Sequence, residues 1–336
     1  MSNFIHLDNI TRRFISVPPL SERLAKRITG SSASPTIVHA VEGVSLAVAK
    51  GETLGLVGES GCGKSTLGRV AAGILTATMG QASVDAEPVM VGGRKKTTRI
   101  QMVFQDPYAS LNPRMRIGDT ISEGPLAHGL ITRTQAADDV TRWLTAVGLD
   151  AAAAQRFPHQ FSGGQRQRVA IARALAMRPD ALVCDEPVAS LDVSIQAQII
   201  NLFLQLRRDL NLTMLFISHD LSVVRHVSDR VAIMYLGRIV ETGPTEQIFT
   251  APRHPYTRAL LESAPRLAAS GATAQDIQPI HGELPSPINP PGGCAFHQRC
   301  AFAQNRCKND LPILHRVGDE HQTACHFPLE SPHHVA

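Results

Sequence analysis

The sequence has no apolar run of the roughly 18–20 residues that a membrane-spanning helix needs. Its first residues, Met1 to His6, lack the charged and then apolar pattern of a signal peptide. We therefore expect a protein that is made and kept in the cytoplasm. The net charge of +4 over 336 residues is mild and forms no dense basic stripe. A nucleic-acid partner is not expected on that ground.

Close Cys-x-x-Cys pairs, the usual sign of structural zinc, are also absent. Two of the six cysteines, Cys62 and Cys184, lie inside other motifs. The other four cluster near the end: Cys294, Cys300, Cys307 and Cys325. A cytoplasmic location argues against structural disulfides among them. Their spacing leaves open a metal centre, reduced thiols in a loop-rich tail, and zinc with His297 or His326 replacing one thiolate.

A phosphate-binding loop is present after a short apolar strand at 54–57. The stretch Gly58-Glu59-Ser60-Gly61-Cys62-Gly63-Lys64-Ser65 fits G-x-x-x-x-G-K-[ST]. Its N–H groups can surround phosphates, Lys64 can reach the β and γ oxygens, and the Ser65 hydroxyl can bind Mg²⁺. The alternative is a glycine-rich turn with a coincidental Lys-Ser. The candidate nucleotide-binding residues here are Gly58, Ser60, Gly61, Cys62, Gly63, Lys64, Ser65 and Thr66, with no chemistry assigned to the Cys62 thiol.

Two carboxylates, Asp185 and Glu186, end the apolar stretch Ala181–Cys184. Ligands of parallel α/β sheets lie at the C-terminal ends of strands. Asp185 suits a Mg²⁺ ligand, and Glu186 suits a group that polarises the attacking water. The alternative is a solvated strand end. Three further elements follow successive strands in the same way: Gln105, the turn ending at Asp192, and His219.

A second glycine-rich loop, Phe161 to Arg168, is the most informative feature. Ser162, Gly163, Gly164 and Gln165 precede a helix-like run at 166–177. The free N–H groups and partial positive charge of a helix N-terminus favour an anion there. One triphosphate does not need two such loops, unless two copies of the chain face each other.

The chain divides into three parts by pattern. We expect a nucleotide-binding core at 1–112 and 158–248, a helical subdomain at 113–157, and a small C-terminal accessory domain with the cysteine cluster at 249–336. An edge strand is expected at 1–15, and a surface loop with a short basic helix at 16–36. Further strands are expected at 38–48, 54–57, 99–104, 181–184 and 214–217, with helices at 65–75 and 193–210. A helix between two apolar strands is a βαβ unit and predicts a parallel sheet.

Taken in order, these motifs resemble the ATP-binding cassette of ABC transporters, with Phe161 in place of the usual Leu of the Leu-Ser-Gly-Gly-Gln signature. Three further segments are similar to the ATPase subunits of bacterial oligopeptide and dipeptide importers, and most to the F-type of their paired D and F ATPases. These segments are Val103–Arg114, Arg253-His254-Pro255-Tyr256-Thr257 and Gly282-Glu283-Leu284-Pro285-Ser286-Pro287. The resemblance implies an α/β P-loop NTPase fold: a RecA-like core with an antiparallel β edge and a helical insert, plus the accessory domain.

The resemblance also implies roles. Glu186 is the general base, His219 positions the γ-phosphate and water, and Gln105 senses both the metal and the membrane partner. Mg²⁺ is held by Ser65, Gln105 and Asp185. Ser162, Gly163, Gly164 and Gln165 contact ATP on the opposite subunit, and Asp192 links the two sites. Phe14 lies where such subunits carry an adenine-stacking aromatic, although an ordinary strand Phe is the alternative.

For partners, the resemblance implies a D-type ATPase subunit, two transmembrane permease subunits and, indirectly, an extracytoplasmic peptide-binding protein. The permeases' coupling helices would dock near 105–114 and 113–157. The chain would lie on the cytoplasmic face of the bacterial cell membrane. Relatives carry a [4Fe–4S] cluster in the C-terminal region, which favours that cofactor for the four late cysteines. The alternatives are a nickel-chelate or glutathione importer, a soluble non-transport ABC ATPase, and a simple P-loop kinase.

Overall fold

The computed structural model describes residues 3–17, 35–263 and 282–330. Its main element is an eight-stranded sheet in the order β13-β14-β12-β11-β3-β10-β9-β8. The strands β8, β9, β10, β3 and β11 run parallel, whereas β12, β14 and β13 add antiparallel pairs. The strands of this sheet are β3 (Thr53–Val57), β8 (Ile100–Val103), β9 (Ala181–Asp185), β10 (Thr213–Ile217), β11 (Arg230–Tyr235), β12 (Arg238–Pro244), β13 (His315–Gly318) and β14 (His321–Thr323). Because β3, β9 and β10 are buried along their whole length, they are apolar runs without alternation, as the sequence predicts.

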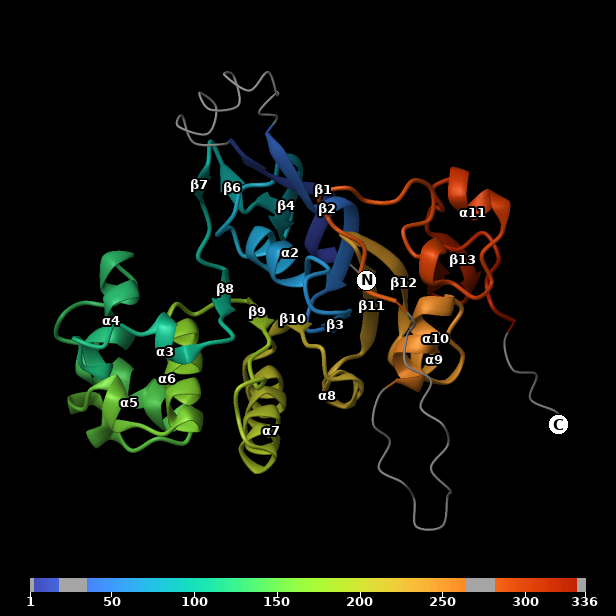
Figure 1. Cartoon of the computed structure of the whole chain (residues 1–336). Coiled ribbons are helices and arrows are strands. Elements are labelled where there is room, and N and C mark those ends of the chain that lie inside the picture. The colour runs from blue at the N-terminus through green and yellow to red at the C-terminus, as the bar shows by residue number, and fades with distance from the viewer. Residues whose placement is uncertain (1–2, 18–34, 264–281, 331–336) are drawn as a thin grey trace, which may run out of the picture.

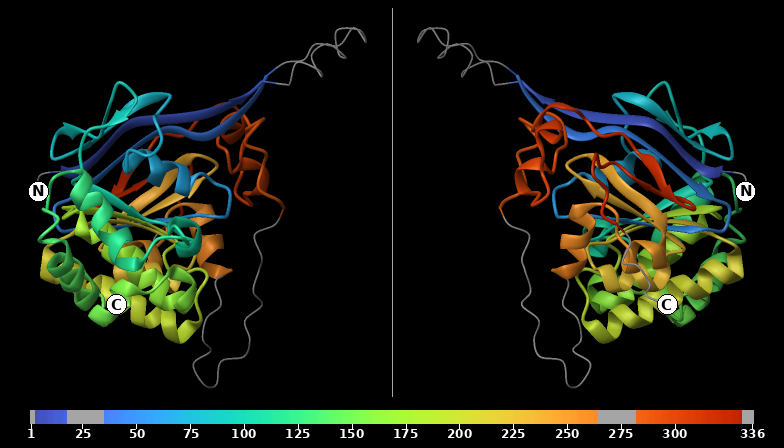
Figure 2. Two further views of the ribbon diagram at one scale, coloured as in Figure 1. Left: turned by 90° about the vertical axis from the view of Figure 1, so that its left-hand side faces the viewer. Right: turned by 90° about the vertical axis from the view of Figure 1, so that its right-hand side faces the viewer.

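A second, antiparallel sheet has the order β2-β1-β4-β5 and lies over the first (Figure 2). Its strands are β1 (Asn3–Ser16), β2 (Thr36–Ala49), β4 (Met79–Val84) and β5 (Glu87–Pro88), with a separate hairpin of β6 (Met90–Val91) and β7 (Arg94–Lys95). Helix α2 (Lys64–Ala71) packs between the two sheets, with Leu67 completely buried. The prediction of an edge strand at 1–15 is wrong, because β4 pairs with the free side of β1.

The helical part lies beside the sheets (Figure 1). Its elements are α3 (Pro107–Ser110), α4 (Ile117–Ala127), α5 (Ala136–Ala146), the 3₁₀ turns Ala151–Gln155 and Pro158–Gln160, and α6 (Gly163–Ala176). Trp143 and Leu144 of α5 are buried against α6, so that one apolar core joins this part to the sheet. Helices α7 (Val193–Leu210) and α8 (Leu221–Val227) cover the sheet face opposite α2.

The C-terminal part packs on the β11–β12 side of the sheet (Figure 1). Its helices are α9 (Thr245–Thr250), α10 (Pro255–Glu262), the 3₁₀ turn His297–Arg299 and α11 (Asn305–Asn309). It is not confined to a unit of its own, since β14 pairs with β12 of the large sheet. The buried pair of Glu241 Oε1 and His321 Nε2, 2.7 Å apart, holds these strands together. The domain limits drawn from the sequence stay a prediction, and most of the expected basic segment at 16–36 lies outside the described residues.

Among the residues that the structure describes, none belongs to a helix with the length and apolarity needed to cross a bilayer.

Candidate functional site

The phosphate loop joins β3 to α2, and its lysine is held inside it. Lys64 is 4% exposed, and its Nζ donates hydrogen bonds to the carbonyl oxygens of Gly58 at 2.7 Å and Glu59 at 2.9 Å. Gly63 has a φ of 109°, and a Cβ there would lie 2.1 Å from the Ala40 carbonyl oxygen. Only glycine fits that position, because both the backbone angle and the space exclude a side chain.

Ser65 and Asp185 meet next to this loop. The Ser65 Oγ, in the first turn of α2 with Thr66, donates to Asp185 Oδ1 at 2.7 Å. Asp185 is 2% exposed, and burial raises its pKa against the opposing effect of the Ser65 hydrogen bond. A hydroxyl and a carboxylate are the oxygen ligands that Mg²⁺ takes beside substrate phosphates. The donor set therefore fits Mg²⁺.

Glu186, Gln105 and His219 come together from the ends of the neighbouring strands β9, β8 and β10. Glu186 Oε2 accepts a hydrogen bond from Gln105 Nε2 at 3.0 Å and lies 3.2 Å from His219 Nδ1. Glu186 has a φ of 45°, in the left-handed region that is costly for residues with a side chain. Its N–H donates to the Ile217 carbonyl oxygen at 2.9 Å, which holds that backbone in place. The predicted trio is thus within hydrogen-bonding reach.

The second glycine-rich loop begins α6. Ser162 caps the helix: its Oγ accepts the Gln165 N–H at 3.3 Å, while Gln165 Oε1 accepts the Ser162 N–H at 3.1 Å. This capping box uses acceptor oxygens, so the Ser162 hydroxyl proton and the Gln165 amide N–H groups can still donate to an anion. The loop lies in the helical part, apart from α2 (Figure 1).

Two further predicted residues lie at exposed positions. Asp192 immediately precedes α7, beside the 82% exposed Val193. Phe14, on β1, is 37% exposed, and the Arg12 guanidinium lies 4.6 Å from its ring centroid.

The four late cysteines line one small cavity, with His254 and the ring of Phe296 among the other lining groups. Burial raises the pKa of the Cys294 and Cys300 thiols, and raises that of Cys325 to about 11. Four thiols form a suitable donor set for a metal cluster. Across 3–17, 35–263 and 282–330, however, no three His, Cys, Asp or Glu side chains are arranged so that they could hold a metal ion. The four thiols are therefore suitable ligands for the expected cluster, but the structure does not arrange them as a metal site.

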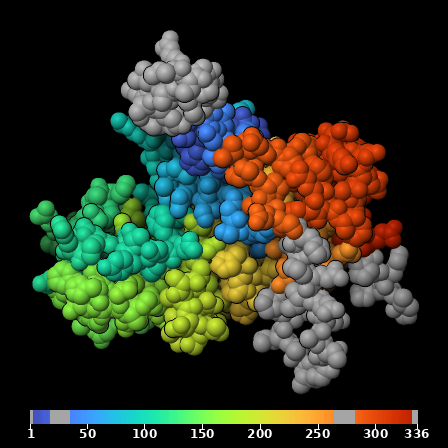
Figure 3. All heavy atoms as spheres, in the orientation of Figure 1, coloured from blue at the N-terminus to red at the C-terminus, as the bar shows by residue number. Residues whose placement is uncertain are grey.

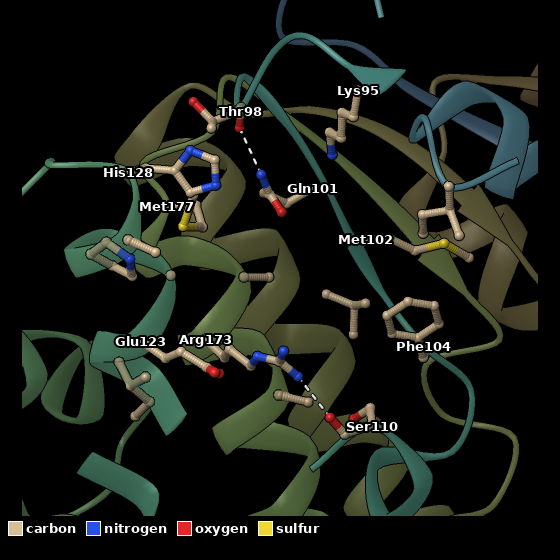
Figure 4. A pocket seen from close by; sticks show the side chains of 18 of the residues that line it. Lys95, Thr98, Gln101, Met102, Phe104, Ser110, Glu123, His128, Arg173 and Met177 are labelled. Carbon is tan, nitrogen blue, oxygen red and sulfur yellow. Dashed lines mark hydrogen bonds between the residues drawn. The ribbon is translucent and has the colours of Figure 1, made fainter. Parts of the chain in front are cut away.

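A groove of about 560 Å³ lies between the sheet and the helical part (Figure 4). Its lining includes the apolar side chains of Met102, Phe104 and Met177 and polar groups such as Glu123 and Arg173. Arg173 Nη1 donates to the Ser110 carbonyl oxygen at 2.7 Å, which joins α6 to the segment after α3. Seven of the twenty residues that line the groove, from Ser110 to His128, belong to the region 105–157 in which we expect the membrane subunits to dock.

Two residues reach the phosphate loop that the sequence did not single out for it. Tyr256 Oη accepts the Glu59 N–H at 3.0 Å, and Arg299 Nη1 lies 3.0 Å from Glu59 Oε1. Tyr256 belongs to the Arg-His-Pro-Tyr-Thr segment, and Arg299 immediately precedes Cys300. Their positions next to these motifs were the only hint in the sequence. Neither position predicts a contact with Glu59, which lies 197 residues from Tyr256 and 240 residues from Arg299.

Comparison with known proteins agrees with this site. Residues 41–189 match the family model "ABC transporter", and residues 240–307 match "Oligopeptide/dipeptide transporter, C-terminal region". The chain is 49% identical to the oligopeptide transport ATP-binding protein AppF of Bacillus subtilis, over 86% of this chain and 90% of AppF. It is 48% identical to the di/tripeptide transport ATP-binding protein DppF of Pseudomonas aeruginosa, over 86% and 90%.

Solved structures are similar at lower identity. One is cbiO1 of Clostridium perfringens, part of the ABC transporter complex cbiONQ, with a TM-score of 0.59, 26% identity and coverage of 74% of this chain and 91% of that one. Another is a dimeric ATP-binding cassette in a post-hydrolysis state bound to ADP and Pi, with a TM-score of 0.58, 25% identity and coverage of 72% and 98%. The expectations of the ABC cassette fold and of an ABC-type ATPase are confirmed. The chain belongs to the ABC transporter family, among the ATP-binding proteins of oligopeptide and dipeptide transporters.

Proposed function

We propose that this chain is one of two ATPase subunits that energise the import of short peptides across the cell membrane. The main support for the proposal is that the chain has two anion-binding loops that lie apart from each other: the phosphate loop and the loop that begins α6. Lys64 and Glu186 lie at one end of the sheet, while Ser162 to Gln165 begin α6 in the helical part. Two facing cassettes would supply the second loop to each ATP, and a similar cassette was solved as a dimer bound to ADP and Pi.

In this proposal the residues divide the reaction between them. Lys64 and the loop N–H groups hold the phosphates, and Ser65, Asp185 and Gln105 hold Mg²⁺, which neutralises phosphate charge when bound. Glu186 orients the attacking water and accepts its proton. His219, 3.2 Å away, holds the carboxylate in place and contacts the γ-phosphate. Asp192 links the two ATP sites, and Phe14 stacks on adenine.

The proposed partners are a D-type ATPase subunit, two permease subunits and an extracytoplasmic peptide-binding protein. We place a short cytoplasmic helix of one permease in the groove between the sheet and the helical part of this chain. A helix with an apolar face and polar flanks would suit its mixed lining of apolar and polar side chains. The chain would then lie peripherally on the cytoplasmic face of the membrane. Relatives that are 48–49% identical over most of their length are oligopeptide and di/tripeptide transport proteins, which favours peptides as the cargo over nickel chelates or glutathione.

Transport by the reconstituted complex tests this function. The chain, its D-type partner and the permeases are placed in proteoliposomes with the binding protein, and uptake of labelled di- and tripeptides is measured with and without ATP. We expect ATP-dependent uptake that is lost with Glu186→Gln. ATP hydrolysis without peptide uptake, but with uptake of nickel chelate or glutathione, would identify the alternative cargo. A chain that assembles with no permease would indicate the non-transport alternative.

For the cysteine cavity we propose a [4Fe–4S] cluster, because four thiols line one cavity in a segment with few apolar residues. Because the pKa values of these thiols are raised, binding of the cluster must release their protons. The sulfur atoms must also move into positions from which they can bind iron. Anaerobic purification followed by iron and sulfide analysis and visible absorption tests the proposal. Iron-free, colourless protein, or a cluster unchanged by Cys300→Ser with Cys307→Ser, would contradict it.

A further inference from the structure

The second residue of the phosphate loop, Glu59, is held from two sides through three different groups. Its carbonyl oxygen accepts Lys64 Nζ at 2.9 Å. Its N–H donates to Tyr256 Oη at 3.0 Å. Its carboxylate accepts two hydrogen bonds from Arg299 Nη1, at 3.0 and 3.1 Å. The lysine that reads phosphate and two residues of the C-terminal part therefore act on the same residue.

The C-terminal contacts are partly buried. The Arg299 side chain is 6% exposed, and the side chain of Glu59 is 25% exposed. Arg299 Nη1 also donates to Tyr235 Oη at 3.3 Å, and its guanidinium lies 5.8 Å from the Tyr235 ring centroid. A charge pair in such a place is screened less by water and salt than a surface pair. It can therefore fix the position of a loop.

Three aromatic rings support Arg299 from behind. The rings of Tyr235 and Tyr256 are 4.7 Å apart, and each is 5.3 Å from Phe296. Phe296 lines the cysteine cavity and immediately precedes the 3₁₀ turn His297–Arg299. The space-filling view shows the C-terminal residues packed directly against the N-terminal half of the core (Figure 3). The position of Arg299 is thus set by the wall of the cavity.

We propose that Arg299 is a positioning residue of the ATP site, so that the C-terminal part completes the phosphate loop and sets its affinity for ATP. This rests on the proposed ATPase function. When Lys64 turns from the Glu59 carbonyl to a phosphate, the loop loses one of its ties. Arg299 and Tyr256 keep Glu59 in place. The loop N–H groups therefore stay ordered, and ATP binding does not have to offset the entropy cost of ordering them.

Equilibrium ATP binding to the full chain tests the proposal, with Arg299→Ala compared with Arg306→Ala. Arg306 is an exposed arginine of the same C-terminal part, paired with Asp310 at 3.4 Å. We expect Arg299→Ala to raise the Kd and the KM for ATP about tenfold, as loss of a partly buried charge-assisted hydrogen bond would. Turnover at saturating ATP should change less than twofold, and Arg299→Lys should restore part of the affinity. Arg306→Ala should bind ATP as the unchanged protein does.

A double-mutant cycle and a fold control complete the test. Glu59→Gln should weaken ATP binding by itself and add little to Arg299→Ala, because both variants remove the same charge pair. A lower Tm with an unchanged Kd, measured where the variant is folded, would mean a structural role only and overturn the proposal. If Arg299→Ala does not fold, Tyr256→Phe removes one hydroxyl contact to the same residue, and an unchanged Kd there overturns it equally. Normal ATP binding without peptide uptake would reject the transport function and leave this proposal standing, whereas absence of ATP binding in the unchanged protein would reject both.

Discussion

Oε2 of Glu186 lies 3.2 Å from Nδ1 of His219, between the ends of the neighbouring strands β9 and β10. The same oxygen accepts the Gln105 amide at 3.0 Å. One carboxylate atom therefore meets both polar neighbours, and a water next to it would be oriented by all three side chains.

Glu186→Gln should abolish ATP turnover and leave ATP binding intact. The amide keeps the size of the side chain but cannot accept a proton from water, and loss of a general base costs about 10²–10⁴-fold in rate. The measurement is steady-state hydrolysis beside the Kd for ATP. Asp220→Asn, at the N-cap of α8 one residue beyond His219, is the control for a nearby lost charge. Near-normal hydrolysis by Glu186→Gln would contradict the general-base role.

Gly164→Ala should destabilise the protein, by about 1–3 kcal/mol, the usual cost of overpacking. A Cβ at Gly164 would lie 2.5 Å from Ile195 Cγ2, in the first turn of α7, whereas at Gly163 the nearest atom is 3.4 Å away. Urea unfolding of Gly164→Ala and Gly163→Ala measures the difference, and Gly163→Ala should be close to neutral. Ile195→Ala in the Gly164→Ala background should recover part of the loss. Equal effects of the two glycine variants would contradict the steric explanation.

The same contact limits what a charged substitution at Gly164 can show about the second loop. A Gly164→Asp variant would crowd Ile195 in the first turn of α7, which follows Asp192, in addition to placing a negative charge near the partner's ATP. Loss of hydrolysis in Gly164→Asp would therefore not isolate the phosphate contact. Gly163→Asp introduces the same charge with less crowding and is the cleaner probe.

Much of this site was predictable because its motifs are local. The phosphate loop, the strand ending at Asp185 and the capped start of α6 each require only a few consecutive residues, and parallel strands bring their ends to one edge. The pairing partners of β1 were not predictable in the same way. β4, Met-Gly-Gln-Ala-Ser-Val, has little alternation to mark a strand, yet it turns β1 from an edge strand into an interior one.

The C-terminal part was the least predictable for the same physical reason. β14 has three residues, and it joins the large sheet through pairing with β12 and the buried contact of His321 with Glu241, 80 positions away. The contacts of Tyr256 and Arg299 with Glu59 are longer still in sequence. Contacts of this kind depend on how whole elements pack, which no spacing pattern encodes.

Filling the groove should uncouple transport without affecting the isolated ATPase. Ala127, at the end of α4, is exposed and lines the groove, so Ala127→Trp would place an indole where the permease helix is proposed to bind. Ala137→Trp, at an exposed position of α5 that does not line the groove, is the matched control. Co-purification with the permeases and peptide uptake should fall at least tenfold with Ala127→Trp only. Equal loss in both variants, or in neither, would contradict the docking site.

Acid should destabilise the C-terminal part through His254. This side chain is 1% exposed, and burial lowers its pKa from 6.5 to about 4 despite the opposing charge of Glu241. Between pH 6.5 and pH 4, His254 therefore binds a proton in the unfolded chain but not in the folded chain. Its contribution to the free energy of unfolding is fully present above pH 6.5 and is lost as the pH falls toward 4. Between pH 7 and pH 5 the loss is about 2 kcal/mol.

The variant His254→Asn isolates this contribution. His254 Nδ1 accepts the Tyr256 N–H at 3.0 Å as the N-cap of α10, and asparagine can cap in the same way without titrating. Urea unfolding of metal-free protein at pH 7 and pH 5 gives the free energy of unfolding of each form. The unchanged protein should lose about 2 kcal/mol more than His254→Asn over this interval. Equal losses would mean that His254 is not the group whose protonation destabilises the fold.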